Sequence, residues 1–186
     1  MAYSARGNCY AHLDKFDLAR QDIQKAIELD SLQPEFIQNR AMLFYTMGKL
    51  DSAGMDLATV QRLGGVVDST FYLKYDASIR ELEMKIKECS ERIRQGKDLT
   101  SSYNIRGVAF FTLGNLRQAV RDFSEALKLD PDNQNYLINR LAGYQAQSLF
   151  DSAFFDYRTA GQYGYPIDSL VLEHLREMAD DQKKSP

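Results

Sequence analysis

Hydrophobic and small residues recur three and four positions apart along this chain, in short blocks divided by polar or glycine-containing breaks. The clearest case is residues 103–131, where one apolar block ends just before Gly114 and another begins at Leu116. Such spacing is typical of amphipathic helices, and a glycine can end a helix in a left-handed conformation. The pattern therefore predicts a hairpin of two helices that ends at Asp130 and Pro131.

Small residues at matching points of the two predicted helices allow their backbones to approach closely. Gly107 lies in the first helix, Ala119 and Ala126 lie in the second, and Phe110 and Phe123 provide bulk around them. In these residues the stretch resembles the tetratricopeptide repeat, a helix-turn-helix unit of about 34 residues. One such hairpin cannot bury both of its faces, so neighbouring repeats are expected.

Three more stretches fit the same register. We expect two repeats in residues 1–67 and two in residues 100–167, with the small positions of the other three repeats held by Gly7, Ala19, Ala26, Ala41, Ala53, the larger Val60, the larger Leu141, Ala153 and Ala160. The resemblance implies an all-α fold, a right-handed α-solenoid of stacked helical hairpins.

A second period lies above the repeat. Residues 1–86 align with residues 101–186 without a gap, and the alignment pairs Asp51-Ser52-Ala53 with Asp151-Ser152-Ala153. We therefore expect two tandem two-repeat modules, each ending in an extra helix that an Asp-Ser pair can cap. The remaining segments are predicted to be an extra helix and helical connector in residues 68–99, a C-terminal capping helix in residues 168–181, and disorder in residues 182–186.

The connector carries an apolar stripe, which consists of Tyr72, Tyr75, Ile79, Leu82, Ile86, Cys89 and Ile93. No glycine or proline interrupts residues 69–95, so one long helix is one prediction. The other is a break near residues 76–78, because Ser78 and Glu81 have the form of a capping box. The stripe would either pack between the two modules as a spacer or form a coiled coil that makes a homodimer.

Composition and charge exclude several classes of protein. The chain has 186 residues, is 44% hydrophobic and carries a net charge of -3, whereas nucleic-acid-binding surfaces usually show a basic excess. No apolar run is long enough for a membrane span, so the chain as written is expected in the cytoplasm. The register places Met1 inside a first helix, so we expect sequence upstream. With an N-terminal signal removed, the protein would be periplasmic or secreted.

Residues of the kinds used in catalysis or metal binding are few and scattered. His12 and His174 are the only histidines, and Cys9 and Cys89 are too far apart in the sequence for a zinc motif. No Ser-His-Asp spacing and no phosphate-binding glycine loop is present. The sequence therefore predicts no enzyme, no metal and no cofactor.

Each repeat has an arginine in its first helix and an aspartate at a fixed distance along its second helix. A set that recurs in every repeat is more typical of a structural ladder than of a catalytic group. We expect ion pairs between helices or between adjacent repeats. The residues are Arg6 and Asp22, Arg40 and Asp56, Arg106 and Asp122, and Arg140 and Asp156.

The resemblance implies a concave surface, lined by the first helix of each repeat, on which a partner would bind. The candidate partner-binding residues there are Asn8, His12, Gln38, Met42, Tyr45, Asn104, Val108, Phe111, Ile138 and Gln145. They comprise amide, aromatic and apolar side chains and no Lys or Arg. We interpret Tyr45 and Phe111 either as exposed anchors or as side chains packed against a neighbouring repeat or the connector.

The sequence favours an interaction scaffold that binds a peptide or protein segment on this surface without catalysis. The alternative is a structural spacer or a self-associating segment of a larger protein. A third interpretation is a co-chaperone, since members of this family hold the acidic tail of a chaperone with a clamp of lysines and asparagines. Asn8 and Asn39 match the clamp asparagines, but Ser4 stands in place of the first clamp lysine, which disfavours that interpretation.

Overall fold

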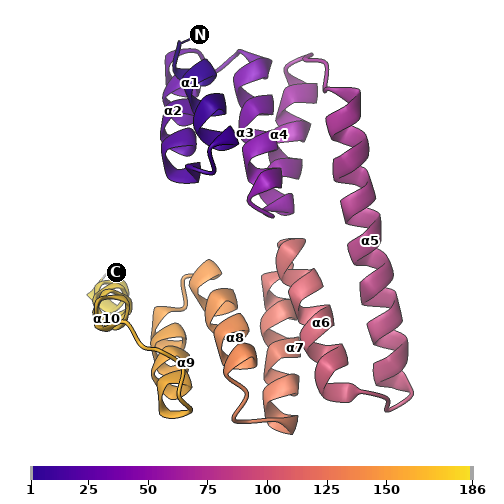
Figure 1. Cartoon of the computed structure of the whole chain (residues 1–186), viewed down its shortest axis with the longest axis vertical. Coiled ribbons are helices and arrows are strands. Elements are labelled where there is room, and N and C mark those ends of the chain that lie inside the picture. Colours follow the sequence, from indigo (N-terminus) through magenta and orange to yellow (C-terminus); the bar gives the residue numbers. More distant parts are fainter. Residues whose placement is uncertain (1, 185–186) are drawn as a thin grey trace. The chain divides into compact units, whose positions relative to one another are not determined.

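A computed structural model describes residues 2–184, and within this range all regular secondary structure is helical (Figure 1). The all-α prediction is therefore confirmed. The helices are α1 (Ala2–His12), α2 (Phe16–Leu29), α3 (Pro34–Thr46), α4 (Leu50–Arg62), α5 (Ser69–Arg94), α6 (Leu99–Thr112), α7 (Leu116–Leu129), α8 (Gln134–Ala146), α9 (Phe150–Gln162) and α10 (Ser169–Lys184).

The described residues divide into two compact units. Unit 1 consists of residues 2–81 with 112–114, and unit 2 consists of residues 82–111 with 115–184. The boundary thus falls inside α5 rather than between the connector and the third repeat. Unit 1 contains the hairpins α1–α2 and α3–α4, and unit 2 contains α6–α7 and α8–α9, so every predicted repeat is a helical hairpin.

Small residues hold each hairpin together, because they let the two helices approach closely. Ala19 and Ile23 of α2 are fully buried and form a core with Leu43 of α3. In unit 2, the ring of Phe123 fills the space that a Cβ atom on Gly107 would need. Helical spacing of apolar residues therefore produces two core clusters in each unit.

The turn inside each hairpin has one residue with a positive φ angle. Gly48 and Gly114 hold this position in two repeats, with φ angles of 71° and 75°. Asp14 and Ser148 hold it in the other two, with φ angles of 55° and 58°. A left-handed conformation is unfavourable for most L-residues, so the turn is less favourable in the repeats that lack the glycine.

The connector forms one uninterrupted helix, α5, without a break near residues 76–78. Its apolar stripe is engaged within the chain: Tyr75 packs with the core of unit 1, and Cys89 is buried in unit 2. Phe71 is the buried aromatic residue at the start of α5, whereas Tyr72, which we placed in the stripe, is 43% exposed. The first half of α5 therefore packs in unit 1, and its second half packs in unit 2.

Aspartates cap the two extra helices. Oδ1 of Asp68 accepts a hydrogen bond from the backbone N–H of Phe71 at 2.7 Å, and Oδ1 of Asp168 accepts one from Leu170 at 2.8 Å. The helix α10 continues to Lys184, so residues 182–184 are helical where disorder was expected; residues 185–186 lie outside the described range. Between residues 2 and 184, no helix combines the length and the apolar character that a membrane crossing requires.

Candidate functional site

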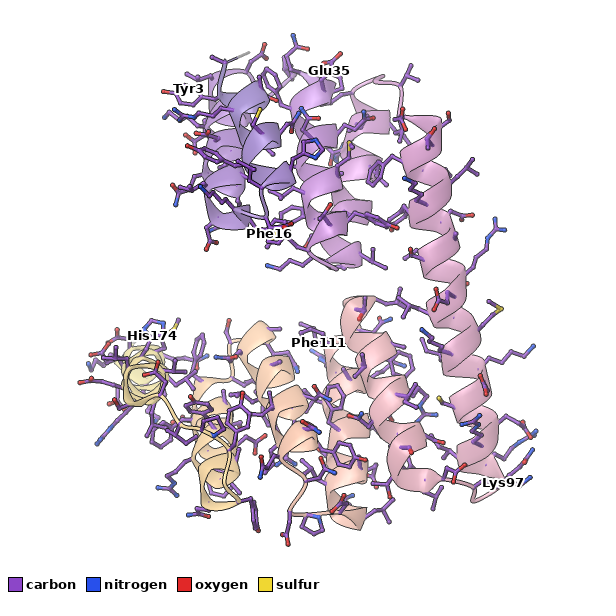
Figure 2. The ribbon with its side chains drawn as sticks, viewed as in Figure 1. Tyr3, Phe16, Glu35, Lys97, Phe111 and His174 are labelled. Atoms are coloured by element: carbon purple, nitrogen blue, oxygen red, sulfur yellow. The ribbon has the colours of Figure 1, made fainter. Side chains whose placement is uncertain are left out.

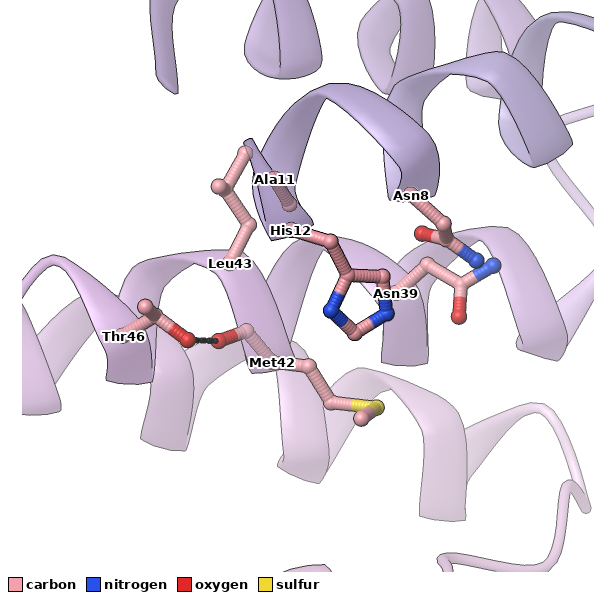
Figure 3. A pocket seen from close by; sticks show the side chains of 7 residues that line it. All are labelled: Asn8, Ala11, His12, Asn39, Met42, Leu43 and Thr46. Atoms are coloured by element: carbon pink, nitrogen blue, oxygen red, sulfur yellow. Dashed lines mark hydrogen bonds between the residues drawn. The ribbon is translucent and has the colours of Figure 1, made fainter. Parts of the chain in front are cut away.

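A groove runs along unit 1 between α1 and α3, the first helices of the first two repeats. One part of it is a cavity of about 170 Å³ that is lined by Asn8, Ala11, His12, Asn39, Met42, Leu43 and Thr46. Figure 3 shows the amides of Asn8 and Asn39 next to one another and the ring of His12 pointing toward α3. The buried Leu43 and the half-buried Ala11 give this cavity an apolar floor. We call the unit 1 groove the surface formed by this cavity and by the adjoining hollow at the start of α3, whose residues are given in the next paragraph.

A second hollow of about 360 Å³ continues the groove toward the start of α3. Its lining residues are Ser4, Ala5, Asn8, Gln33, Glu35, Phe36 and Asn39. Because Asn8 and Asn39 line both hollows, the two form one surface. Figure 2 shows Glu35 in the first turn of α3, where it places a carboxylate at the end of the groove. The lining of both hollows includes no Lys or Arg.

Several polar groups of the unit 1 groove have no partner among residues 2–184. Nδ2 of Asn39 donates a hydrogen bond to Oγ of the buried Ser4 at 2.9 Å, which fixes the orientation of the amide. The Oδ1 atom of Asn39, the amide of Asn8 and both ring nitrogens of His12 make no hydrogen bond to the described residues. These groups can donate to and accept from a bound chain.

Two of the predicted binding residues of unit 1 do not line this groove: Tyr45 contacts α5, and Gln38 contacts Asp68, the residue before α5. The ring of Tyr45 lies 5.5 Å from that of Phe71 in an edge-to-face arrangement, and its hydroxyl lies 3.1 Å from Oγ of Ser78. Oε1 of Gln38 accepts a hydrogen bond from the backbone N–H of Asp68 at 3.0 Å. Of the two interpretations of Tyr45, the structure therefore favours packing against the connector.

The predicted binding residues of unit 2 form a more apolar surface. Val108 on α6 is 41% exposed, Phe111 is half-buried, and Gln145 on α8 is exposed. Ile138 packs against two core clusters, so its side chain is largely committed to the fold. Oδ1 of Asn104 accepts a hydrogen bond from Nδ2 of Asn139 at 2.8 Å, which matches the bond between Asn39 and Ser4 in unit 1.

The recurring arginines and aspartates form four bidentate ion pairs. In each, Nε and Nη2 of the arginine donate to the two carboxylate oxygens, at 2.6 and 2.7 Å for Arg6 and Asp22 and at 2.7 and 2.7 Å for Arg106 and Asp122. The hydrogen bond from Arg6 lowers the pKa of Asp22 below its usual range. The pairs Arg40–Asp56 and Arg140–Asp156 have the same geometry.

The ladder residues connect helices and do not line the unit 1 groove. The guanidinium of Arg106 also lies 5.6 Å from the ring centre of Tyr103 and 5.9 Å from that of Phe110, on its own helix. In this arrangement a carboxylate of one helix binds a guanidinium of the neighbouring helix, and aromatic rings surround the guanidinium. Such contacts hold helices together. Within residues 2–184, no three His, Cys, Asp or Glu side chains are arranged to hold a metal ion.

A further hollow of about 550 Å³ lies between α9 and α10 in unit 2. Phe154 of α9 lines one side of it, and the other lining residues all lie on α10: Ser169, Leu172, Glu173, Arg176, Glu177 and Asp180. Three of these are acidic and one is an arginine, which is typical of the solvent-facing side of a helix. The unit 1 groove, with walls from two helices, is the better defined site.

Sequence reasoning left Asn39 and Leu43 out of the candidate binding residues. Asn39 was recognised as similar to a clamp asparagine, and its place in two adjacent hollows makes it the central polar group of the groove. Leu43 is 2% exposed and packs against the preceding helix α2. A search of the sequence for exposed residues on the concave surface therefore does not select it.

Comparison with known proteins gives one family and several relatives. The family model for the tetratricopeptide repeat matches residues 1–31 and 101–133. Human (Homo sapiens) DnaJ homolog subfamily C member 3 is 24% identical over 192 residues, which cover 92% of this chain and 38% of that protein. Mouse (Mus musculus) sperm-associated antigen 1 is 27% identical over 181 residues, which cover 95% of this chain and 19% of that protein.

Solved structures of helical repeat proteins also align with the chain. The crystal structure of YrrB, a TPR protein with an unusual peptide-binding site, is 16% identical in sequence. The alignment covers 94% of this chain and 90% of that one, with a TM-score of 0.44. The chain spans less than two fifths of the length of the two curated relatives named above.

Proposed function

Because this chain belongs to the tetratricopeptide repeat family, we propose that it is a non-catalytic interaction module that binds an extended segment of another protein in the unit 1 groove. The observation that carries the proposal is the junction of two hollows at Asn8 and Asn39. Their side-chain amides have free donors and acceptors, which suit the backbone of an extended peptide.

The shape and polarity of the groove specify the ligand further. An apolar side chain of the ligand would enter the cavity above Ala11, Met42 and Leu43, where it loses contact with water. Met42 is 43% exposed and flexible, so it can adapt to different side chains. The amides of Asn8 and Asn39 would then fix the direction of the bound backbone.

Charge in the groove favours a neutral or basic ligand. Glu35 is the only carboxylate in the lining, and no cation is present there to pair with an acidic ligand. An acidic chaperone tail would lie beside Glu35 with its own carboxylates unpaired, which is unfavourable. The proposed partner is therefore a neutral or basic segment rather than an acidic tail or a nucleic acid.

The proposal can be tested with matched methionine variants. Peptides would be selected from a random library on the immobilised full chain, and their binding would be measured by fluorescence anisotropy. Met42→Glu replaces an apolar contact of the cavity with a carboxylate that an apolar side chain of the ligand would desolvate, so it is expected to weaken binding by more than about tenfold. Met55→Glu is the control, because Met55 lies on α4 outside the groove and is 60% exposed.

Two results would contradict the proposal. One is a library that yields no peptide bound by the full chain, which would favour the structural spacer. The other is a set of peptides that bind Met42→Glu as tightly as Met55→Glu, which would place the binding surface elsewhere. Circular dichroism of both variants would show that the helices are intact.

A further inference from the structure

The two hollows of the unit 1 groove follow one another along α1 and α3. Residues early in both helices, such as Ser4 and Glu35, line one hollow, and residues later in both, such as Ala11 and Met42, line the other. Glu35 and Met42 are separated by two helical turns, so they share one face of α3. At a rise of about 1.5 Å per residue, they lie about 10 Å apart along the helix axis. A ligand that contacts both must bridge this distance.

Glu35 provides an available carboxylate at one end of this distance. Its side chain is exposed and makes no hydrogen bond or ion pair to another residue within the range 2–184. The same position of the other repeats is Met1, Ser101 and Asn135. The helices α6 and α8 form without an acidic residue in their first turn. A first helix therefore does not need an acid at this position, and the carboxylate of Glu35 can bind a ligand.

The amides of Asn8 and Asn39 lie between the two ends, because these residues line both hollows. The Oδ1 atom of Asn39 and the whole amide of Asn8 have no partner among the described residues. The backbone groups of a ligand helix would be bonded within that helix and could not use them. A segment in the polyproline II conformation has no internal hydrogen bonds, so its backbone N–H and C=O groups are available. The amides therefore favour a ligand that is not helical.

The distance of about 10 Å distinguishes between extended conformations. Polyproline II has about three residues per turn and rises about 9 Å in each turn, so side chains three positions apart lie on the same side. In a β-strand, the side chains on one side are two or four positions apart, which corresponds to about 7 or 13 Å. The polyproline II spacing is the one that matches the groove.

We propose that the unit 1 groove selects a segment in the polyproline II conformation that carries a Lys or Arg three positions from an apolar residue. The apolar side chain enters the cavity beside Met42 and Leu43, and the cation pairs with Glu35. The amides of Asn8 and Asn39 bind the backbone between them. The inference rests on the proposed function, because it specifies the ligand of the same groove. Polyproline II is a major conformer of unfolded chains, so a disordered basic segment is already close to the bound conformation.

Synthetic peptides test the spacing. Each fluorescent peptide would carry one Leu and one Lys in a background of Ser and Gln, with the two residues two, three, four or seven positions apart and in both orders. Their affinities for the full chain would be measured by anisotropy. In one of the two orders, the spacing of three is expected to bind tightest, by about fivefold over the others, which is the upper range for an exposed ion pair. The spacing of seven represents a helical ligand.

Substitution of Glu35 tests the cation site. Glu35→Gln is expected to weaken binding of the peptide with spacing three by about threefold to fivefold, and to leave the same peptide with Gln in place of Lys unchanged. Glu28→Gln on α2 is the control, because it removes the same charge from an exposed residue outside both hollows. Glu35→Lys should restore tight binding of a peptide that carries Glu in place of Lys. In about 1 M NaCl these differences should shrink, because salt screens exposed charges.

Circular dichroism of the Glu35 variants provides the control for folding, since an acid in the first turn can also stabilise a helix. The inference is wrong if no designed peptide binds, if affinity does not depend on spacing, or if the spacings of two, four or seven bind tightest. It is also wrong if Glu35→Gln and Glu28→Gln weaken binding equally. The proposed function survives each of these results as long as peptides from the random library bind the chain and are weakened by Met42→Glu. Failure of this inference and failure of the proposed function are therefore distinguishable.

Discussion

The hydroxyl of Tyr75 occupies the space that a Cβ atom on Gly54 would need. The equivalent positions in unit 2 are Phe154 and Leu175; Leu175 is 1% exposed, and Phe154 packs against the core cluster that contains it. Unit 1 therefore places a glycine opposite a long tyrosine side chain, whereas unit 2 has two large apolar residues at the same positions.

A double-mutant cycle tests this relationship. Gly54→Ala alone is expected to stabilise unit 1 by much less than the ~1 kcal/mol that alanine normally gains over glycine in a helix. In a Tyr75→Phe background, which removes the hydroxyl, most of that gain should appear. Urea denaturation measures both. Equal stabilisation in the two backgrounds would show that the hydroxyl does not constrain Gly54.

Ser102 is expected to destabilise unit 2. Its side chain is 1% exposed, and its Oγ atom is buried without a hydrogen-bond partner among the described residues. An unsatisfied buried hydroxyl costs about 1 kcal/mol or more. Ser102→Ala should therefore raise the free energy of unfolding by about 1 kcal/mol. Ser101→Ala, at the exposed neighbouring position, is the control and should change little. A destabilised Ser102→Ala variant would contradict the prediction.

The buried members of the ladder should matter most for stability. The side chains of Asp122 and Arg106 are 4% and 19% exposed, so Asp122→Ala leaves a largely buried cation without its partner. We expect a loss of about 3 kcal/mol. Glu125→Ala, in the exposed pair with Lys128 on the same helix, should cost less than about 1 kcal/mol. Comparable losses for the two variants in chemical denaturation would argue against this assignment.

Acid should weaken unit 1 through Asp22. Because the hydrogen bond from Arg6 lowers the pKa of Asp22 in the folded state, the ionised form is favoured by folding. Its contribution is therefore fully present above the unfolded pKa of about 3.9 and is lost as the pH falls through the lower, folded value. Asp22→Asn removes this titration. Urea midpoints between about pH 2.5 and 6 should fall less steeply for the variant than for the native chain.

Tyr45 should behave as a core residue. Its edge-to-face contact with Phe71 and its hydrogen bond to Ser78 attach α5 to α3. Tyr45→Ala is expected to destabilise unit 1 by about 2 kcal/mol, and Tyr45→Phe by about 1 kcal/mol through the lost hydrogen bond. Thermal unfolding of both variants checks this. A fully stable Tyr45→Ala variant with altered ligand binding would restore the interpretation of Tyr45 as an exposed anchor.

The periodic part of the structure could be predicted from the sequence. Apolar spacing locates the hairpins, and in two of the four repeats a glycine also marks the turn, because both signals act within one repeat. The side-chain partner of Arg106 is an example: Asp122 lies on the next helix of the same hairpin, at a separation that every repeat shares. Local geometry therefore determines these contacts.

Contacts that depend on how a helix is rotated against other helices could not be predicted in the same way. The stripe on α5 gave Tyr72 as the first packed residue, whereas the structure buries Phe71, one position earlier. Ser78 meets Tyr45 across 33 residues of sequence, and no periodic pattern links them. The unit 1 groove likewise depends on Leu43, whose burial is decided by the preceding helix.

The continuous helix α5 also has a consequence for how the chain unfolds. Its first turns are held by Phe71 in one unit and its later turns by Cys89 in the other. Nucleating a helix is unfavourable, whereas extending an existing one is not, so each unit lowers the cost of ordering the part of α5 that the other unit needs. Melting is therefore expected to spread from one unit to the next through shared backbone hydrogen bonds, as in a one-dimensional nearest-neighbour system.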